Sequence, residues 1–350
     1  LAAAAERWAD RLEIVWDVQS LEGFESTPIP ELARSYDLIV LDHPHLGEAV
    51  AADCIVPVAD LLGDEAVARI AGATVGSCAA SYVYDGRSYA LPLDAATQVQ
   101  ALQPALAGDL PAPETWAEVL ALAADRPMAL SLAGPHALLT FCSICAGLGA
   151  SPFAPGESRL RALAVLQELA EHSVASLREA NPIQLLEAMA RDRAAACCPL
   201  VYGYVNYARA GSGREALRFA DAPALGSTLG GTGIALTRRC PLAPELAEHL
   251  AWLLDPATQT TFIPRHEGQP SARSAWADPA LDAGSGGFYS GTLRTTEAAW
   301  VRPRFPGYIE FQSRGSELIR EGLAERTPAP RLLDRLDALW RASLPTGAVP

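Results

Sequence analysis

The sequence has no excess of positive charge and no long unbroken apolar run. Lys and Arg number 27 against 41 Asp and Glu, which gives a formal net charge of −14. Such a chain repels a phosphate backbone, so we expect no nucleic acid partner. The longest uncharged stretch, residues 127–156, is interrupted by Gly134-Pro135. Each half is shorter than the roughly 20 apolar residues that cross a bilayer, so no membrane span is predicted.

Motifs of several enzyme and metal-binding classes are also missing. The chain has no G-x-S-x-G nucleophile elbow, and residues 226–233 lack the GK[ST] ending of a phosphate loop. Cys142-x-x-Cys145 lies in an apolar helical run without a second Cys pair nearby, and Asp42-His43-Pro44-His45 offers only two nitrogen ligands. We therefore expect no catalytic residue, no metal and no cofactor.

The residues that are present predict a large α/β protein. A chain of 350 residues, half of them apolar, is long enough for two domains with substantial cores. Helical periodicity alternates with short apolar strands, which is the α/β pattern. The apolar run 37–41 is typical of a strand in a parallel sheet. Strands are predicted at 12–16, 37–41, 128–132, 194–201 and 234–237, and helices at 1–11, 30–35, 113–124, 137–147, 157–173, from 182 onward, 244–254, 256–262 and within 305–342.

A series of short motifs resembles one protein family. Gly86-Arg-Ser-Tyr-Ala-Leu-Pro-Leu-Asp94 resembles the G-K-x-Y-G-L-P-x-D crossover of the extracellular solute-binding proteins of family 1, the sugar-binding subunits of ABC importers. Later segments resemble that family's later motifs in the same order, over roughly residues 12–342. These segments are Pro113-Glu-Thr-Trp116, Arg193-Ala-Ala-Ala196, Gly231-Thr-Gly233 followed by Ile234-Ala-Leu236, Leu253-Leu-Asp-Pro-Ala-Thr-Gln259 and Gly268-Gln-Pro-Ser-Ala-Arg273.

This resemblance implies the fold and its division into lobes. The fold would be that of a type II periplasmic binding protein, or Venus flytrap: two α/β lobes joined by hinge crossovers, with a ligand cleft. We expect lobe 1 to contain residues 1–93 and 236–300, and lobe 2 to contain 94–235 and 301–350. The segment Leu91–Asp94 would be the first crossover. The protein is expected to be a monomer.

Polar and aromatic residues at predicted strand ends are the candidate ligand contacts, because ligands of open α/β domains bind outside the carboxyl ends of strands. Sugar hydroxyls are bound by carboxylates and amides, and the apolar ring faces of sugars stack on aromatic rings. Asp42 could equally cap a turn, and Tyr202 and Tyr204, which share one face of a strand, could equally be core residues. The candidates are Asp42, His43, Asp94, Tyr202, Tyr204, Asn206, Gly231, Thr232 and Tyr308.

The resemblance implies non-enzymatic binding of a small polar solute, which we expect to be a carbohydrate. The protein would be the substrate-binding component of an ABC importer, with the membrane permease as its partner, in the periplasm or otherwise outside the cytoplasm. Seven cysteines, and a start at Leu1–Glu6 that lacks the features of an export signal, leave open a cytoplasmic metabolite-binding sensor on the same fold. A thiaminase I-like enzyme is the other alternative, but Ala95 and Ala96 occupy the place expected for its cysteine nucleophile.

Overall fold

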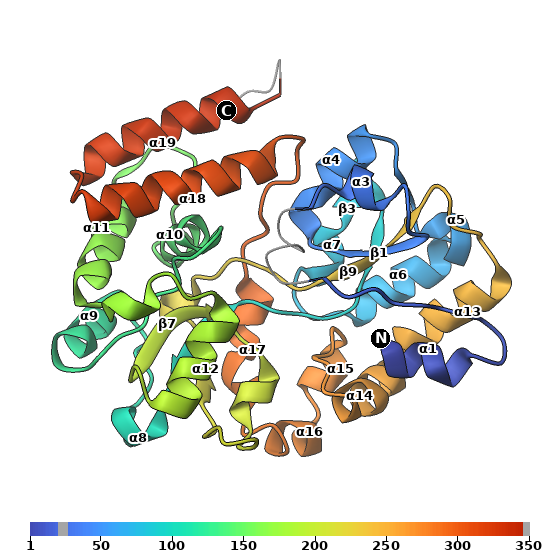
Figure 1. Ribbon diagram of the computed structural model, residues 1–350, viewed down its shortest axis with the longest axis horizontal. Helices are drawn as coiled ribbons and strands as arrows, with labels where there is room; N and C mark the ends of the chain where they lie inside the picture. The colour runs from blue at the N-terminus through green and yellow to red at the C-terminus, as the bar shows by residue number, and fades with distance from the viewer. Residues whose placement is uncertain (20–26, 346–350) are drawn as a thin grey trace. The chain divides into compact units, whose positions relative to one another are not determined.

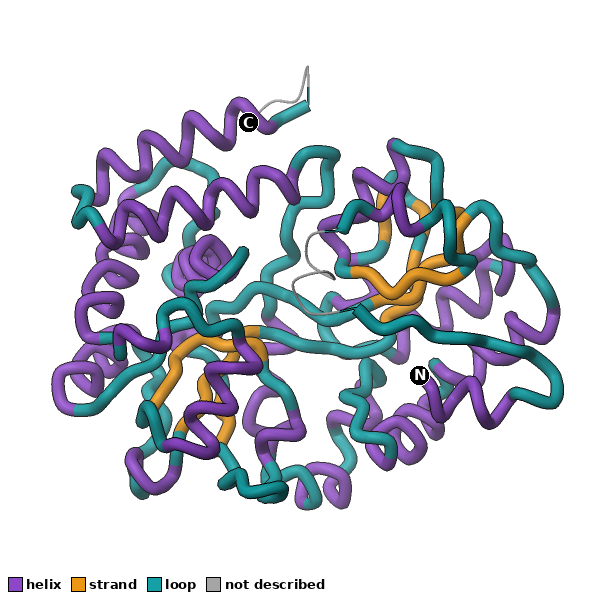
Figure 2. The backbone as a smooth tube through the Cα atoms, viewed as in Figure 1, coloured by secondary structure: helices purple, strands orange, loops and turns teal. Residues whose placement is uncertain are grey.

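The computed structural model describes residues 1–19 and 27–345, and the chain divides into two compact α/β units (Figure 1). Unit 1 contains residues 1–95, 231–281 and 302–306. Unit 2 contains residues 96–230, 282–301 and 307–350. Each unit has its own small sheet surrounded by helices, as the tube in Figure 2 shows by colour.

Strand β9 (Gly233–Thr237) is the centre of the sheet in unit 1. It pairs with β1 (Leu38–Leu41) on one edge, and with β2 (Ile55–Val56) and β5 (Ala90–Pro92) on the other. All three pairings are antiparallel, so the parallel pairing predicted for residues 37–41 is wrong. That run is apolar because helices cover both faces of the sheet, which an antiparallel strand allows equally well.

The two faces of this sheet bury separate hydrophobic clusters. Because side chains alternate along a strand, Ile234 and Leu236 join one cluster with residues of α1, α6 and α13, while Ala235 joins the other with residues of α3 and α4. Short helices and a two-stranded hairpin make up the rest of the unit. The helices and hairpin strands of unit 1 are α1 (Ala2–Trp8), α3 (Ile29–Leu32), η1 (His43–His45), α4 (Leu46–Ala51), α5 (Ala59–Leu62), α6 (Asp64–Ala73), α7 (Cys78–Ser81), β3 (Val83–Tyr84), β4 (Arg87–Ser88), α13 (Pro244–Leu253), α14 (Pro256–Arg265), α15 (Arg273–Trp276) and the start of α16 (Pro279–Ala283).

In unit 2 the strand β6 (Gln98–Leu102) lies between β7 (Cys197–Tyr202) and β8 (Arg218–Ala220), again antiparallel. Gln98 faces Tyr202, so β7 ends where β6 begins. Helix α10 is buried along most of its length and packs against α11 and α18. The helices of unit 2 are α8 (Pro104–Ala107), α9 (Trp116–Asp125), α10 (His136–Gly147), α11 (Glu157–His172), η2 (Ala175–Leu177), α12 (Pro182–Asp192), η3 (Val205–Ala208), η4 (Pro223–Leu225), α17 (Phe288–Ala298), α18 (Tyr308–Ala324) and α19 (Ala329–Ser343).

Two predicted strands are absent from the described part of the chain. Residues 12–16 alternate between half-buried and exposed side chains, as a strand would, but they form no ladder. Around 128–132 only Met128 makes bridges, to Ser173 and Cys197. Period-two alternation identifies an extended segment, but a strand also needs a neighbouring backbone with which to pair.

The boundaries of the units differ from the expected lobes. A division after residue 235 would cut β9, whose residues from Gly233 onward pair with β1, so residues 231–235 belong to unit 1. Residues 282–301 belong to unit 2, because α17 packs against β8 and Thr295 bonds to Asp221. The first passage of the chain between units follows residue 95, and the short segment 302–306 returns to unit 1.

Candidate functional site

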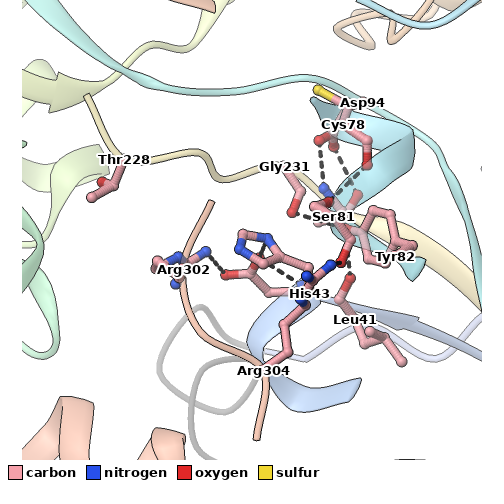
Figure 3. A network of polar contacts seen from close by, with 12 residues as sticks. Leu41, His43, Cys78, Ser81, Tyr82, Asp94, Thr228, Gly231, Arg302 and Arg304 are labelled. Carbon is pink, nitrogen blue, oxygen red and sulfur yellow. Dashed lines mark hydrogen bonds and ion pairs between the residues drawn. The ribbon is translucent and has the colours of Figure 1, made fainter. Parts of the chain in front are cut away.

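The register of β9 brings three of the candidate residues to one edge of the sheet in unit 1 (Figure 3). Leu41, which Figure 3 labels, ends β1. Pro92 ends β5, and both residues face Gly233 at the start of β9. Asp42 therefore follows β1, and Asp94 follows β5, at the same edge where Thr232 precedes β9. All three side chains are half-buried.

Asp42 is held by a buried cation. Its carboxylate forms an ion pair with Arg302, whose side chain is 3% exposed, and accepts a bond of 2.8 Å from the backbone N–H of His43. Burial alone would raise the pKa of Asp42. The positive charge of Arg302, together with the bonds from His43 and Arg302, outweighs burial and holds that pKa well below its usual range. Asp42 is therefore ionised at any physiological pH.

His43 is fully buried and neutral at pH 7. Burial, followed by the charge of Arg302, lowers the pKa of His43 to about 4. Its Nδ1 lies 3.1 Å from Asp42 Oδ1 without the alignment of a hydrogen bond, and Nε2 has no hydrogen-bond partner among the described residues. The ring packs edge-on against Tyr82, with the centroids 6.3 Å apart.

Asp94 bonds to Thr232 through both oxygens. The backbone N–H of Thr232 donates to Oδ1 at 2.7 Å, and its hydroxyl donates to Oδ2 at 2.8 Å. Burial raises the pKa of Asp94 to about 6, against the opposing effect of these bonds. A carboxylate oxygen accepts two hydrogen bonds, so Asp94 keeps capacity for a ligand hydroxyl.

The return segment, residues 302–306, is fixed to unit 1 at three points. Arg302 pairs with Asp42, and the Nη1 atom of Arg304 lies 2.8–2.9 Å from three carbonyl oxygens at and just beyond the end of α7 (Figure 3). A cation is favourable there because the last carbonyls of a helix have no intrahelical partner. The backbone of the segment also touches Gly47 of α4, where a Cβ would lie 1.7 Å from the carbonyl oxygen of Arg304.

Tyr82 covers the start of β9. Its hydroxyl lies 3.3 Å from the carbonyl oxygens of Leu41 and Gly231, to which it donates. Its ring lies so close to Gly233 that a Cβ there would be 2.6 Å from Cζ. Gly231 has a φ of +88°, in the left-handed region that favours glycine. The glycines of the segment 230–233 are thus required by a ring contact and by backbone conformation.

In unit 2, Tyr202 packs against Gly230, at the start of the segment 230–233, as Tyr82 packs against Gly233 at its end. Its hydroxyl lies 3.2 Å from Thr228 Oγ1, and its ring lies against Gly230, where a Cβ would be 2.4 Å from Cε1. Thr228 also donates to Gln98 Oε1 at 3.1 Å, and that oxygen accepts from the Ser143 hydroxyl at 2.6 Å. These buried polar groups all belong to unit 2 and lie near the first two passages of the chain between units.

The other predicted contacts of unit 2 are more dispersed. Tyr204 precedes η3 and Asn206 lies within it, so neither continues the strand, and the expected shared face of Tyr202 and Tyr204 is absent. Both Tyr204 and Asn206 are half-buried. Tyr308 begins α18, is fully buried, and packs with its ring centroid 6.0 Å from that of Phe311.

Several residues of this arrangement were not predicted from the sequence. Arg302, Tyr82, Gln98 and Thr228 carry polar contacts around the candidates, yet each lies far along the chain from its partner. Arg302 is 260 positions from Asp42, and Thr228 is 130 positions from Gln98. No local sequence signal marks Arg302, because the Arg-x-Arg spacing of residues 302–304 also occurs at 159–161 and 191–193.

Solved structures match almost the whole chain, whereas no protein-family model and no curated protein sequence matches it. An ABC transporter solute-binding protein from Agrobacterium radiobacter, in complex with ribitol, has a TM-score of 0.79 at 21% identity, with 96% of this chain and 93% of that chain covered. Maltose-bound MalE3 of T. maritima has a TM-score of 0.81 at 16% identity, covering 98% and 95%. UgpB from Mycobacterium tuberculosis, in complex with glycerophosphocholine, has a TM-score of 0.74 at 15% identity, and the match covers 97% of this chain and 94% of UgpB.

At these identities the similarity establishes the fold. The chain has the two-lobe α/β fold of periplasmic binding proteins, and the predicted fold class is confirmed. No helix in residues 1–19 and 27–345 combines the length and the apolar character of a membrane span. Within the same residues, His, Cys, Asp and Glu side chains form no group of three or more that could hold a metal ion.

Proposed function

We propose that the protein binds a small polar solute, a sugar or sugar alcohol, without chemical conversion, as the substrate-binding component of an ABC importer. The observation that carries this proposal is the match of the whole chain, at TM-scores of 0.78–0.81, to ABC transporter solute-binding proteins with ribitol or mannitol bound and to MalE3 with maltose bound. The proposal places the protein outside the cytoplasm, with a membrane permease as its partner.

The chemistry of the candidate residues supports a hydroxyl-rich ligand. In unit 1, Asp42 and Asp94 present half-buried carboxyl oxygens at one sheet edge, next to the half-buried residues Gly231 and Thr232. Carboxylates with spare lone pairs accept from hydroxyl groups, and backbone groups donate and accept in return. The charge of Asp42 already has a partner in Arg302, and the guanidinium of Arg304 is bound by three carbonyl oxygens. A neutral ligand can bind there without breaking an ion pair.

The cysteines support binding rather than nucleophilic catalysis. A nucleophilic cysteine needs an exposed thiol with a lowered pKa. Burial raises the pKa of Cys145 and of Cys198 to about 12, and the pKa of Cys240 to about 11. Cys78, in α7, is 2% exposed, and the position after the first crossover is the fully buried Ala95. The thiols of Cys145, Cys198 and Cys240 are therefore protonated at neutral pH.

Calorimetry and thermal unfolding with ribitol, mannitol, tagatose and maltose test the proposal. A ligand that binds only the folded protein stabilises it by about 2.7 kcal/mol at a concentration of 100 Kd, so the unfolding temperature must rise with the concentration of any true ligand. Failure of the full-length protein to give heat or a thermal shift with any sugar or sugar alcohol would exclude this function.

The two asparagines of the chain provide a matched pair of variants. Asn206→Ala removes a half-buried amide at the candidate site, and the loss of a ligand hydrogen bond is expected to weaken binding about tenfold. Asn181→Ala removes the cap of α12, which accepts from Gln184 N–H at 2.9 Å. This control should unfold at a lower temperature yet bind with the same affinity.

A further inference from the structure

The residues around Asp94 lie outside the sheet of unit 1. Strand β5 ends at Pro92, and no strand of the described chain includes residues 93–95. A strand ladder therefore does not fix the backbone that carries the Asp94 carboxylate. Contacts to a ligand keep their geometry when a second layer of hydrogen bonds holds the residues that make them. The loop between α14 and α15 supplies such a layer.

The peptide between Pro92 and Leu93, next to Asp94, is held at both of its polar ends. Its N–H, on Leu93, donates to the carbonyl oxygen of Thr232 at 2.8 Å. Its carbonyl oxygen, on Pro92, accepts from the Ser271 hydroxyl at 2.7 Å. The N–H and the C=O of a trans peptide point in opposite directions, so Thr232 and Ser271 restrain this peptide from opposite sides.

A second side chain of the same loop binds the carbonyl group that follows Asp94. The Nε2 atom of Gln269 donates to the carbonyl oxygen of Ala95 at 2.6 Å. Pro92 and Ala95 lie on either side of Asp94 in the chain, and each has its carbonyl oxygen bound by a side chain of this loop. The loop thus holds the Asp94 segment at two points.

The backbone of the loop is fixed by bonds of its own. Gln259 Oε1 accepts from the Ser271 N–H at 2.7 Å, and the Val75 N–H donates to the Ser271 carbonyl oxygen at 2.9 Å. The indole N–H of Trp276 donates to the carbonyl oxygen of Pro270 at 2.8 Å. Ser271 Oγ also lies 3.3 Å from Gln259 Oε1, but that oxygen keeps the shorter bond from the N–H when the hydroxyl is removed. Removal of the hydroxyl therefore leaves the loop in place.

We propose that Ser271 and Gln269 are positioning residues, which hold the backbone around Asp94 so that its carboxylate is already oriented for the solute. This inference rests on the proposed function, in which Asp94 contacts the solute. Without either donor the segment has more conformations in the free protein, and binding must restrict them, which weakens the affinity. The motif at residues 268–273 thus acts on the site although none of its residues was a candidate contact.

Calorimetric affinities test the proposal, with whichever of ribitol, mannitol, tagatose or maltose the wild type binds. Ser271→Ala removes the hydroxyl that holds the Pro92 carbonyl, and we expect binding to weaken about fivefold. Gln269→Leu, which removes the donor to Ala95, should act in the same direction.

Ser173→Ala is the matched control. Ser173 is a buried serine of unit 2 whose hydroxyl donates to the carbonyl oxygen of Ala170 at 2.9 Å, so the variant loses the same kind of bond. Both serine variants should unfold at a lower temperature than the wild type, whereas only Ser271→Ala should lose affinity. A loss of stability alone does not produce this difference.

A double-mutant cycle with Asp94→Ala identifies the route of the effect. We expect Asp94→Ala to weaken binding, and Ser271→Ala to cause no further loss once the Asp94 carboxylate is absent. Two losses of affinity that multiply, an Asp94→Ala variant with wild-type affinity, or a Ser271→Ala variant with wild-type affinity would each overturn the proposal.

Amide hydrogen exchange gives a readout that needs no ligand, and it decides the proposal where binding is absent or too weak to measure. In Ser271→Ala the Pro92–Leu93 peptide loses its restraint at the carbonyl end, so the Leu93 N–H should exchange about tenfold faster relative to the amides of β9. In Ser173→Ala this ratio should equal that of the wild type. If no sugar or sugar alcohol binds, the proposed function fails, and the ratio alone shows whether Ser271 holds this segment. An unchanged ratio in Ser271→Ala would overturn the inference.

Discussion

Replacement of Arg302 by Met tests the ion pair on which the candidate site of unit 1 is built. The Met side chain is about as long as the apolar part of the Arg302 side chain but carries no charge. Asp42 therefore loses its cation while remaining half-buried. Removing one partner of a buried pair costs about 3–5 kcal/mol, because the other charge is left uncompensated. Arg302 is 3% exposed and Asp42 is 21% exposed, so this estimate applies with little loss to solvent screening.

The pH dependence of unfolding gives a second and more specific expectation. In the wild type the pKa of Asp42 is lowered, so its stabilisation is present above pH 4 and is lost as the pH falls further. In Arg302→Met the effect of burial is no longer opposed by the cation, and the pKa of Asp42 should lie above its usual value. The variant should then become more stable as the pH falls from 7 to 5, a range in which the contribution of Asp42 to the stability of the wild type does not change.

Scanning calorimetry measures both effects. One kcal/mol corresponds to about 2–4 °C in domains of 150–250 residues, so we expect an unfolding temperature roughly 10 °C lower at pH 7. Arg239→Met is the matched control, because Arg239 forms an exposed pair with Asp37 at 3.0 Å and should change stability by at most about 1 kcal/mol. The reasoning is refuted if the two variants are equally stable at pH 7 and show the same pH dependence.

Steric and titration measurements at other positions give independent checks. Gly233→Ala places a Cβ against the ring of Tyr82 and should cost about 1–3 kcal/mol in urea unfolding, with a smaller additional cost when Tyr82→Ala is already present. His43 is buried and neutral with a pKa of about 4, so its contribution to the free energy of unfolding is lost as the pH falls from 6.5 to 4. His43→Gln should therefore remove up to about 3 kcal/mol of acid destabilisation in that range. An unchanged dependence of stability on pH would contradict this expectation. Thr115→Ala removes a capping box of α9 and should cost about 1 kcal/mol without altering ligand affinity.

The helix starts could be predicted because their signals are local. Thr115 and Glu118 form the reciprocal bonds of a capping box at the start of α9, within the helix predicted at 113–124. Asn181 and Gln184 do the same for α12, with Pro182 as the first helical residue. In both cases every interacting group lies within three residues of its partner. A sequence pattern of this length contains the whole interaction.

The positions of Asp42 and Asp94 at strand ends were also predicted, but their partners were not. A strand end is recognised from the apolar run before it, whereas the partners of these carboxylates depend on which segment β9 and residues 302–306 lie beside. The same limit explains the wrong parallel pairing of residues 37–41, because an apolar run reports burial on both faces and not the direction of its neighbour. The expected boundary after residue 235 divides β9 for the same reason, because the strands β1, β2 and β5 with which β9 pairs lie far from it in the sequence.

The contact between Gly47 and the return segment makes a residue without functional groups essential for the candidate site. Any larger side chain at this position of α4 would push residues 302–306 away from unit 1, and Arg302 would move away from Asp42 with them. In an unbiased mutational screen for loss of the ligand binding proposed above, substitutions of Gly47 should therefore appear beside those of the charged residues.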